Sequence, residues 1–476
     1  MRFHSALASL IVLLFSSLAL ARDNGATRGI MVQGPQRPFT DSMSAMIERD
    51  RIRQDEIAAG VRPAPPAMIA VGSHVKKKLK PVRDGDGPFA LFLPAAFHDP
   101  EPDNGQIRDY RTLSPQDIGA SFIGIRMQDQ SPTFWIPPDT CGAIGPDHFA
   151  EILNGSFAIY TRTGTRLSHI TLNSLMTLSS GGTTYPRSYA FDPRLVYDRR
   201  SGRWFAVSLE YNSGNWNHAI LAVSRTSNPS GTWDKYLLAI GRDGWFTDYP
   251  TLGLDDNGVY IAVTLFSSTT STKFIIATRK ASLIASSPYL DIVYQSPDTN
   301  AYYATPFTAV SLDPTPSDGK AWVVGSNPSY YRDMRISSIE WPTSGAPTFS
   351  SVTNLTLLAF DEPPTAPAKG STTNIDAGDM RMHSAFKRNG KVWTCRTVGV
   401  NSLGGSSGAD RTAVEWIELD VSSGSPVISQ SGRLFDGAPS NPVFFYYPSV
   451  AVNGLGQMAV SFSDSNGNRY VSAETT

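Results

Sequence analysis

The chain has 476 residues, enough for two or three ordinary domains or for one large repeat domain. Its 41 basic and 42 acidic residues give a formal net charge of -1, which argues against nucleic acid or an anionic membrane as an electrostatic partner. Glycine (39) and proline (34) are plentiful and only 17% of residues are charged, a composition typical of turn-rich exported β proteins.

The N-terminus has the pattern of a signal peptide. Arg2 precedes the apolar run "ALASLIVLLFSSLALA", which ends in the small-x-small triplet of residues 19–21. A membrane anchor would need about 20 unbroken apolar residues. We therefore expect residues 1–21 to be cleaved, no transmembrane segment to remain, and the mature protein to be secreted, periplasmic or extracellular.

Residues 22–120 differ from the rest of the chain in their residue pattern and are predicted to be a leader and linker. Within them, the spacing of Met43, Met46 and Ile47 and the stop at Gly60 predict one short helix over about residues 41–59. The segments "RPAPPA", "VKKKLK" and "RDGDG" that follow are typical of a solvated linker. The folded domain is then expected to span residues 121–476.

Two cysteines occur, Cys141 and Cys395. A pair of cysteines in an exported protein is compatible with a disulfide. Each lies in an apolar strand-like segment of a non-neighbouring repeat, which favours buried free thiols. Both interpretations stay open at this stage.

From residue 121 onward, short apolar or alternating runs are separated by turn residues, the pattern of an all-β protein. One two-strand phrase recurs six times, starting at residues 137, 192, 248, 304, 379 and 446. The six copies are "PPDTCGAIGPDHFAEILNG", "DPRLVYDRRSGRWFAVSLE", "DYPTLGLDDNGVYIAVTLF", "ATPFTAVSLDPTPSDGKAWVVGS", "DMRMHSAFKRNGKVWTCRTVG" and "YYPSVAVNGLGQMAVSFSD". A period above 50 residues is typical of propeller blades.

Each phrase is predicted to form the two inner strands of one blade. Its turn glycine supplies the positive φ of a tight hairpin, and its strands are apolar on both faces, as blades packed face to face require. A second hairpin over residues 218–240 would complete a four-stranded unit. We therefore predict a β-propeller of about six recognisable four-stranded blades.

The same phrases resemble a family of exported, largely bacterial β-propeller proteins without a settled function. The signatures are "PPDTCGAIGPDHFAEILNGSFAIY", "RLVYDRRSGRWFAVSLE", "TDYPTLGLDDNGVYIAV", "DRTAVEWIELDV" and "YYPSVAVNGLGQMAVSFSDS". The resemblance implies seven blades and no particular reaction. Members continue beyond the last phrase, so the final blade is expected to be missing or incomplete here, unless the strand "SFIGIRM" (residues 121–127) fills its place.

Four acidic residues fall near the starts of the inner strands, where a propeller's central channel opens: Asp139, Asp192, Asp248 and Asp379. They could bind a saccharide or a cationic group, two could act as an acid and base pair, and Asp192, Asp248 and Asp379 could hold Ca²⁺. The alternative is that each aspartate caps its own turn. Trp216 and Trp245 are the aromatic candidates for ligand contact.

Three functions follow as hypotheses. The first is binding of an extracellular saccharide or cell-envelope ligand at the channel face. The second is a glycan-active hydrolase or lyase that uses paired aspartates, although "SDGKAW" (residues 317–322) lacks the spacing of a sialidase hairpin. The third is a purely structural surface protein.

Overall fold

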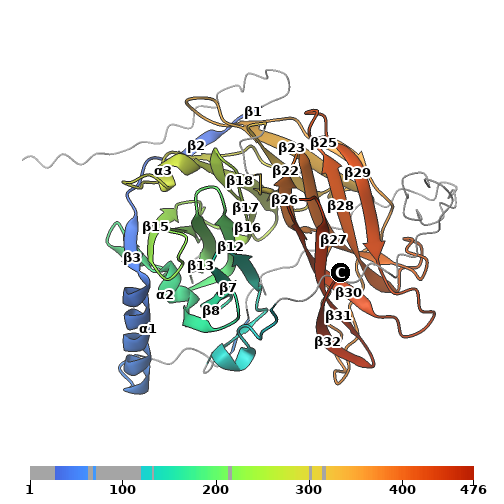
Figure 1. The fold of residues 1–476 in the computed structure, drawn as a ribbon, viewed down its shortest axis with the longest axis horizontal. Helices are drawn as coiled ribbons and strands as arrows, with labels where there is room; N and C mark the ends of the chain where they lie inside the picture. The colour runs from blue at the N-terminus through green and yellow to red at the C-terminus, as the bar shows by residue number, and fades with distance from the viewer. Residues whose placement is uncertain are drawn as a thin grey trace, which may run out of the picture.

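The structure, a computed structural model, describes residues 27–62, 68–70, 120–130, 133–212, 217–299, 303–313 and 318–476. The expected signal peptide lies outside these residues. Six β-sheets follow one another around an arc in chain order, with the first and the last at its two ends (Figure 1). The predicted all-β propeller of about six blades is confirmed.

The first three blades take their strands from consecutive hairpins. Their strands are, in blade 1, β6 (Cys141–Ile144), β7 (His148–Leu153), β8 (Ser156–Thr161) and β9 (Arg166–Thr171); in blade 2, β12 (Tyr189–Asp198), β13 (Arg203–Tyr211), β14 (Ala219–Ser224) and β15 (Thr232–Leu238); and in blade 3, β16 (Phe246–Leu254), β17 (Gly258–Phe266), β18 (Ser271–Arg279) and β19 (Val293–Gln295).

The last three blades are less regular. Their strands are, in blade 4, β20 (Phe307–Thr308), β22 (Lys320–Ser326), β23 (Asp333–Glu340), β24 (Thr348–Phe349) and β25 (Thr353–Thr356); in blade 5, β21 (Val310–Ser311), β26 (Met382–Arg388), β27 (Lys391–Val400), β28 (Arg411–Asp420) and β29 (Val427–Leu434); and in blade 6, β30 (Phe444–Val452), β31 (Met458–Asn466) and β32 (Arg469–Thr475).

Short elements fill the connections. These are the 3-10 helix η3 (Met127–Gln130), α2 (Leu172–Met176), α3 (Lys280–Leu283), the hairpin β10 (Leu178–Ser180) with β11 (Thr183–Tyr185), and β4 (Met68–Ala70) paired in parallel with β5 (Phe134–Ile136). No helix among the described residues is long and apolar enough to cross a membrane.

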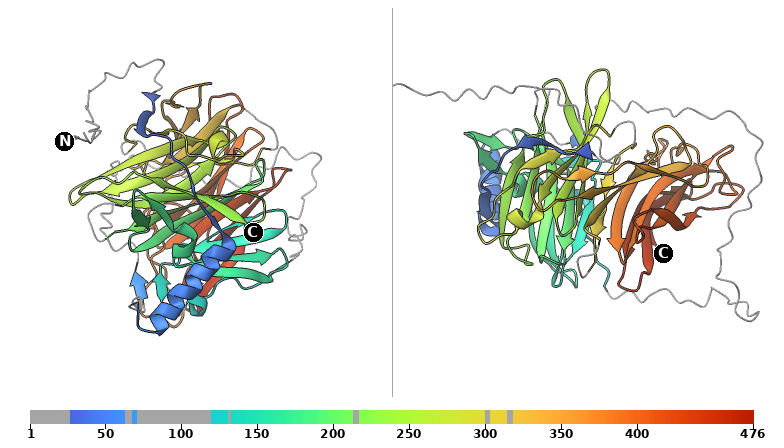
Figure 2. Two further views of the ribbon diagram at one scale, coloured as in Figure 1. Left: turned by 90° about the vertical axis from the view of Figure 1, so that its left-hand side faces the viewer. Right: turned by 90° about the horizontal axis from the view of Figure 1, so that it is seen from above.

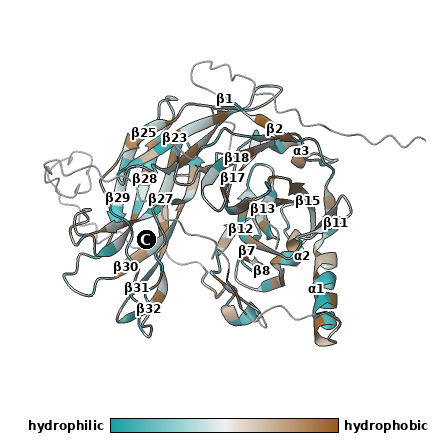
Figure 3. Ribbon diagram, turned by 180° about the vertical axis from the view of Figure 1, so that it is seen from behind, coloured by the Kyte–Doolittle hydropathy of each residue, from teal (hydrophilic) through white to brown (hydrophobic). Residues whose placement is uncertain are grey.

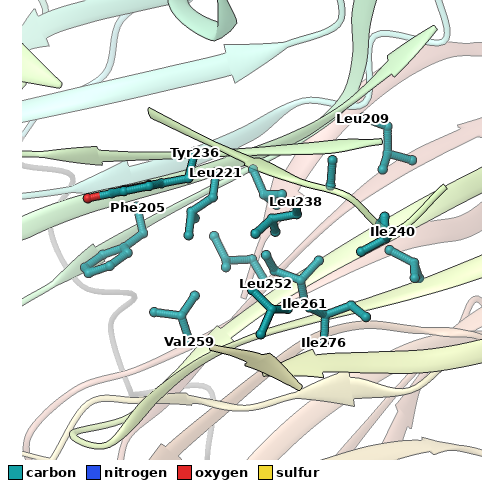
Figure 4. Packing of buried hydrophobic residues seen from close by; sticks show 14 of the residues in the cluster. Phe205, Leu209, Leu221, Tyr236, Leu238, Ile240, Leu252, Val259, Ile261 and Ile276 are labelled. Carbon is teal, nitrogen blue, oxygen red and sulfur yellow. The ribbon is translucent and has the colours of Figure 1, made fainter. Parts of the chain in front are cut away.

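The core lies between the blades. The largest cluster joins blades 2 and 3, where Leu221 and Tyr236 of one sheet meet Leu252, Ile261 and neighbouring residues of the next (Figure 4). Burying one such aliphatic side chain contributes about 1.5–3 kcal/mol. This two-sided burial explains why the repeated phrases are apolar on both faces.

The leader takes part in the propeller instead of preceding it. Strands β1 (Thr27–Arg28), β2 (Ile30–Gln33) and β3 (Phe39–Ser42) pair with β24, β19 and β15, so one leader strand is added to each of blades 4, 3 and 2. This differs from the expected boundary at residue 121. The strands have only two to four residues and no alternating pattern, because backbone hydrogen bonds rather than apolar burial hold them.

Helix α1 (Met43–Ala58) follows β3 and lies along the outside of the sheets (Figure 2). Ser42 caps its N-terminus by accepting from the Ala45 N–H, and Met43 and Met46 are buried. The helix surface mixes hydrophilic and hydrophobic residues, consistent with one face packed and one solvated (Figure 3). The helix bounds fall inside the predicted 41–59.

Asp50 of α1 fixes the helix to blade 1. Its carboxylate accepts from the Thr171 N–H at 2.9 Å, the Thr171 hydroxyl at 2.7 Å and the Ser174 hydroxyl at 2.7 Å. Thr171 caps α2, so the leader helix and α2 share one hydrogen-bonded cluster.

Blade 6 presents one face to solvent. In β30 the odd-numbered residues after Phe445, including Ser449 and Ala451, are exposed while their neighbours are buried. The matching position of Ala451 in blade 3 is Gly253, where a Cβ would lie 2.1 Å from the Thr308 carbonyl oxygen of blade 4. Within the described ranges, no element packs on the face of blade 6 that carries Ser449 and Ala451.

Residues 121–127, the alternative filling offered for this gap, pack on blade 1. The Phe122 ring lies 5.3 Å from the Tyr160 ring and 5.8 Å from the Phe149 ring, and the Ile125 N–H donates to Glu151 Oε2 at 2.8 Å. Residues 121–126 form no strand. They shield the outer face of blade 1 by side-chain packing.

Both cysteines are free. Cys395 is buried in β27, and burial raises the pKa of its thiol to about 12. Cys141 is partly buried, with its Sγ 3.4 Å from the Leu195 nitrogen. The interpretation as free thiols is confirmed.

Candidate functional site

A repeated backbone irregularity shapes the inner ends of three blades. Asp192, Tyr249 and Tyr447 have φ angles of 50°, 53° and 51°, and each directly precedes a proline. At each of them the pairing register of the innermost strand shifts. Such bulges re-aim side chains, and strained backbone of this kind is often found at functional sites.

Asp139 lies just before the inner strand of blade 1 and is joined to blade 2 by Asn154. The buried Asn154 amide donates to Asp139 Oδ2 at 2.9 Å and to the Pro137 carbonyl at 2.9 Å. Its Oδ1 accepts from the Asp192 N–H at 2.8 Å. Asn154 therefore positions two of the predicted aspartates, a role that its sequence context did not reveal.

Two arginines from different blades approach the Tyr249 ring. Arg381 Cζ lies 4.0 Å and Arg194 Cζ 5.6 Å from the ring centroid. The Arg381 guanidinium is held by Asp379, with Nε to Oδ1 at 2.8 Å. Arg194 Nε donates to the Pro250 carbonyl at 3.0 Å. Both cations are thereby fixed in orientation.

His383 and Tyr447 form the side of the site contributed by blades 5 and 6. Their rings meet edge to face with centroids 5.5 Å apart. His383 occupies the register shift of β26, and its Nε2 is buried with no hydrogen-bond partner among the described residues. Burial lowers the pKa of His383 to about 4, so the ring is neutral at pH 7. The Tyr447 side chain is accessible, with 44% exposure.

These residues make up what we call the axial cluster, because they come from five blades and interact at the same end of the inner strands. Its members are Asp139, Asp192, Arg194, Asp248, Tyr249, Asp379, Arg381, His383 and Tyr447.

The electrostatics centre on Asp192. Burial, together with the charges of Asp248 and Asp139 and hydrogen bonds to both, holds the pKa of Asp192 well above its usual range. Burial opposes ionisation of Asp379 as well, but the Arg381 guanidinium keeps the pKa of that carboxyl below its usual range. The surroundings therefore disfavour ionisation of Asp192 and favour ionisation of Asp379.

The predicted aspartates separate into two groups. Asp139, Asp192 and Asp248 interact with one another, whereas Asp379 pairs with Arg381. Asp248 is also not the counterpart of Asp192, because it stands one residue before the register shift, where blade 2 has Phe191. The residues at the position of Asp192 in blades 3 and 6 are Tyr249 and Tyr447. The proline that follows each of them was the sequence signal that could have identified this position.

The aromatic candidates are not part of the cluster. Trp245 is partly buried and packs against the core between blades 2 and 3. Trp216 lies outside the described residues. Tyr249 and Tyr447 are the aromatic residues that the structure brings to the aspartates.

The predicted calcium site gains no support from the described part of the chain. No group of three or more His, Cys, Asp or Glu side chains there is placed to hold a metal ion. Asp379, one of the three proposed ligands, is turned to Arg381 instead.

A separate pocket of about 180 Å³ lies between blades 2 and 3, away from the cluster. Arg203, Arg225 and Asp234 line it, and Arg225 and Asp234 neutralise each other through bonds of 2.9 Å. The axial cluster, which brings carboxyl, guanidinium, imidazole and phenol groups from five blades together, is the stronger candidate.

Comparison with known proteins identifies no family for this chain. No protein-family model matches the chain, and no curated protein matches it. Among solved structures, the subtype N10 neuraminidase-like protein of A/little yellow-shouldered bat/Guatemala/060/2010 is 10% identical over 70% of this chain and 93% of that chain, with a TM-score of 0.35. A xylan β-1,4-xylosidase from Bacillus halodurans C-125 is 12% identical over 71% of this chain and 52% of that chain, with a TM-score of 0.31. Similarity this low says nothing about ligand or activity.

Proposed function

We propose that the axial cluster binds a saccharide of the extracellular medium or of a cell envelope. The observation that carries the proposal is the accessible Tyr447 ring, which packs against His383 and lies within reach of the charges of Asp379 and Asp139. The export of the chain, predicted from its N-terminus, is part of the same proposal.

The chemistry of the cluster suits a polyol. Sugar hydroxyls donate to carboxylate oxygens, and the apolar face of a sugar ring packs on an aromatic ring. Tyr249 is covered by Arg381 at 4.0 Å, so Tyr447 is the ring that can receive a sugar. A ligand site usually has an apolar contact surrounded by a small number of convergent polar groups.

The test is retention of the folded mature protein on a panel of polysaccharides and envelope glycans, with Ca²⁺ and with chelator. Tyr447→Ala should abolish retention, while Tyr470→Ala, an exposed tyrosine on β32 of the same blade, should leave it unchanged. No retention on any glycan would overturn the proposal and favour a structural role. Loss of retention with chelator would restore the calcium hypothesis.

A second candidate is a glycan-active hydrolase or lyase. It is favoured by Asp192, whose raised pKa lets it act as a general acid beside Asp248 or Asp139 as base. Release of soluble sugar that disappears in Asp248→Asn would establish catalysis and replace the binding proposal. Retention without release would support binding alone.

A further inference from the structure

The pocket between blades 2 and 3 lies at the other end of the inner strands from the axial cluster. Arg203, the first residue of β13, pairs with Asp198, the last residue of β12, whereas Asp192 lies near the start of β12. The lining also comes from β14, from β15 and from the segment that follows α3. The pocket is therefore a separate place on the molecule, formed by other residues than the axial cluster.

Charged side chains at this end of the two blades are mostly paired. Arg200 Nε lies 2.5 Å from Asp256 Oδ1. Lys280 Nζ lies 3.0 Å from Asp198 Oδ2. Arg203 is different, because its guanidinium makes no ion pair and no side-chain hydrogen bond with any residue that the structure describes. The pocket thus has a cation in its wall that lacks a counter-ion.

The carboxylate in the lining belongs to Asp234, and its charge is already taken up. Asp234 Oδ1 accepts from the Thr40 hydroxyl at 2.6 Å and from Arg225 Nη2 at 2.9 Å. Asp234 Oδ2 accepts from Arg225 Nε at 2.9 Å. Arg225 Nη1 has no bond to another described residue. With Arg203 included, the described lining carries one net positive charge.

The other polar groups of the lining are two serine hydroxyls. Ser224 Oγ is engaged, since it accepts from the Trp204 N–H and donates to the Thr226 carbonyl, both at 2.8 Å. Ser286 is exposed, and its hydroxyl bonds to no described residue. The unused groups of the pocket can all donate: the Arg203 guanidinium, Arg225 Nη1 and the Ser286 hydroxyl. Convergent donors around a net positive charge match an anionic ligand.

The rest of the lining is apolar and consists of Leu283, Ile284, Ala285 and Pro288. An organic group gains from contact with such a wall, whereas an inorganic anion does not. The volume of about 180 Å³ lies below the range of about 300–1,000 Å³ that is usual for drug-sized ligands. One net charge, an apolar wall and a small volume together favour a small organic monoanion.

We propose that this pocket binds a short aliphatic carboxylate. The carboxylate accepts from the Arg203 guanidinium and from Arg225 Nη1, and the alkyl group packs on Ile284 and Pro288. A guanidinium presents paired N–H groups that suit the two oxygens of a carboxylate. This second binding function is independent of the saccharide binding proposed for the axial cluster.

The test is titration of the folded mature protein with isobutyrate, followed by saturation-transfer NMR of the ligand. Isobutyramide has the same shape without the charge and is the matched control ligand. We expect isobutyrate to bind about tenfold or more tightly than isobutyramide. Acetate, which lacks the branched alkyl group, should bind more weakly than isobutyrate because it leaves the apolar wall uncovered.

Variants locate the binding in the pocket. Arg203→Gln should weaken isobutyrate binding about tenfold and leave the melting temperature unchanged, because no described partner loses a bond. Arg203→Lys keeps the charge without the paired donors and should show intermediate affinity. Ser286→Ala should weaken binding to a smaller extent. Arg199→Gln removes the same charge from the exposed turn between β12 and β13 and should change nothing.

The contrary results are equally specific. Equal affinity for isobutyrate and isobutyramide overturns the anion site. Isobutyrate binding that is unchanged in Arg203→Gln overturns the assignment to this pocket. Tighter binding of inorganic phosphate than of isobutyrate overturns the carboxylate as the ligand class. Absence of isobutyrate binding overturns the whole proposal and has no bearing on saccharide binding at the axial cluster.

Discussion

Asp192 in blade 2 and Tyr249 in blade 3 occupy the same position of successive sheets. Each has a left-handed φ near 50°, each precedes a proline, and each falls in the register shift of its inner strand. The shared backbone directs a carboxyl from one blade and an aromatic ring from the next to the same end of the propeller. One structural repeat thus supplies chemically different groups to one site.

Replacing Asp192 by asparagine should stabilise the protein. The pKa of Asp192 is raised in the folded state, so folding becomes less favourable as pH rises above the unfolded value of about 4. Asparagine removes this cost and tolerates the positive φ. Denaturant unfolding at pH 7 should show a gain on the order of 1 kcal/mol, and the gain should vanish near pH 3. A loss of stability at pH 7 would show that the carboxyl is stabilised by its surroundings.

The open face of blade 6 predicts a contrast between two matched positions. Gly253→Ala should destabilise by about 3 kcal/mol or more, because the added Cβ meets the Thr308 backbone at 2.1 Å. Ala451→Thr, at the matching residue of β30, should change the free energy of unfolding by less than about 0.5 kcal/mol. A large cost for Ala451→Thr in solution would mean that this face is covered.

The contact between the leader helix and blade 1 can be measured through Asp50. Asp50→Ala leaves the Thr171 N–H and the Ser174 hydroxyl without their acceptor and should cost about 1–3 kcal/mol. Asp55→Ala is the control, since this carboxylate lies on the same helix with 65% of its side chain exposed. Equal unfolding curves for the two variants would show that α1 does not stabilise the propeller.

His383 predicts an acid-dependent loss of stability. Its pKa is about 4 when folded and near 6.5 when unfolded, so the unfolded state binds more protons between these values and stability falls as pH drops from about 6.5 to 4. The contribution of this histidine to the loss is about 3 kcal/mol at most. His218, whose pKa is also about 4 through burial, acts in the same direction.

The difference between wild type and His383→Gln isolates one histidine. Melting temperatures across pH 4–7 should fall less steeply in the variant, and a second replacement at His218 should flatten the curve further. Parallel curves for wild type and His383→Gln would contradict the buried neutral state of the ring.

The sequence by itself determined the fold class, the repeated inner hairpins and the position of α1. These features depend on local physical chemistry: period-two apolar spacing, glycines where a turn requires positive φ, and helical spacing ended by Gly60, whose φ is 72°. It also brought forward Asp139, Asp192 and Asp248, because residues near the starts of a propeller's inner strands meet near one axis.

Only the tertiary structure decided the rest. The strands β1, β2 and β3 have no pattern of their own and exist because blade edges offer them hydrogen bonds. The contact of Arg381 with the Tyr249 ring joins residues more than a hundred positions apart. The charge balance of the axial cluster and the open face of blade 6 depend on which sheets pack together. A local sequence pattern does not determine those contacts.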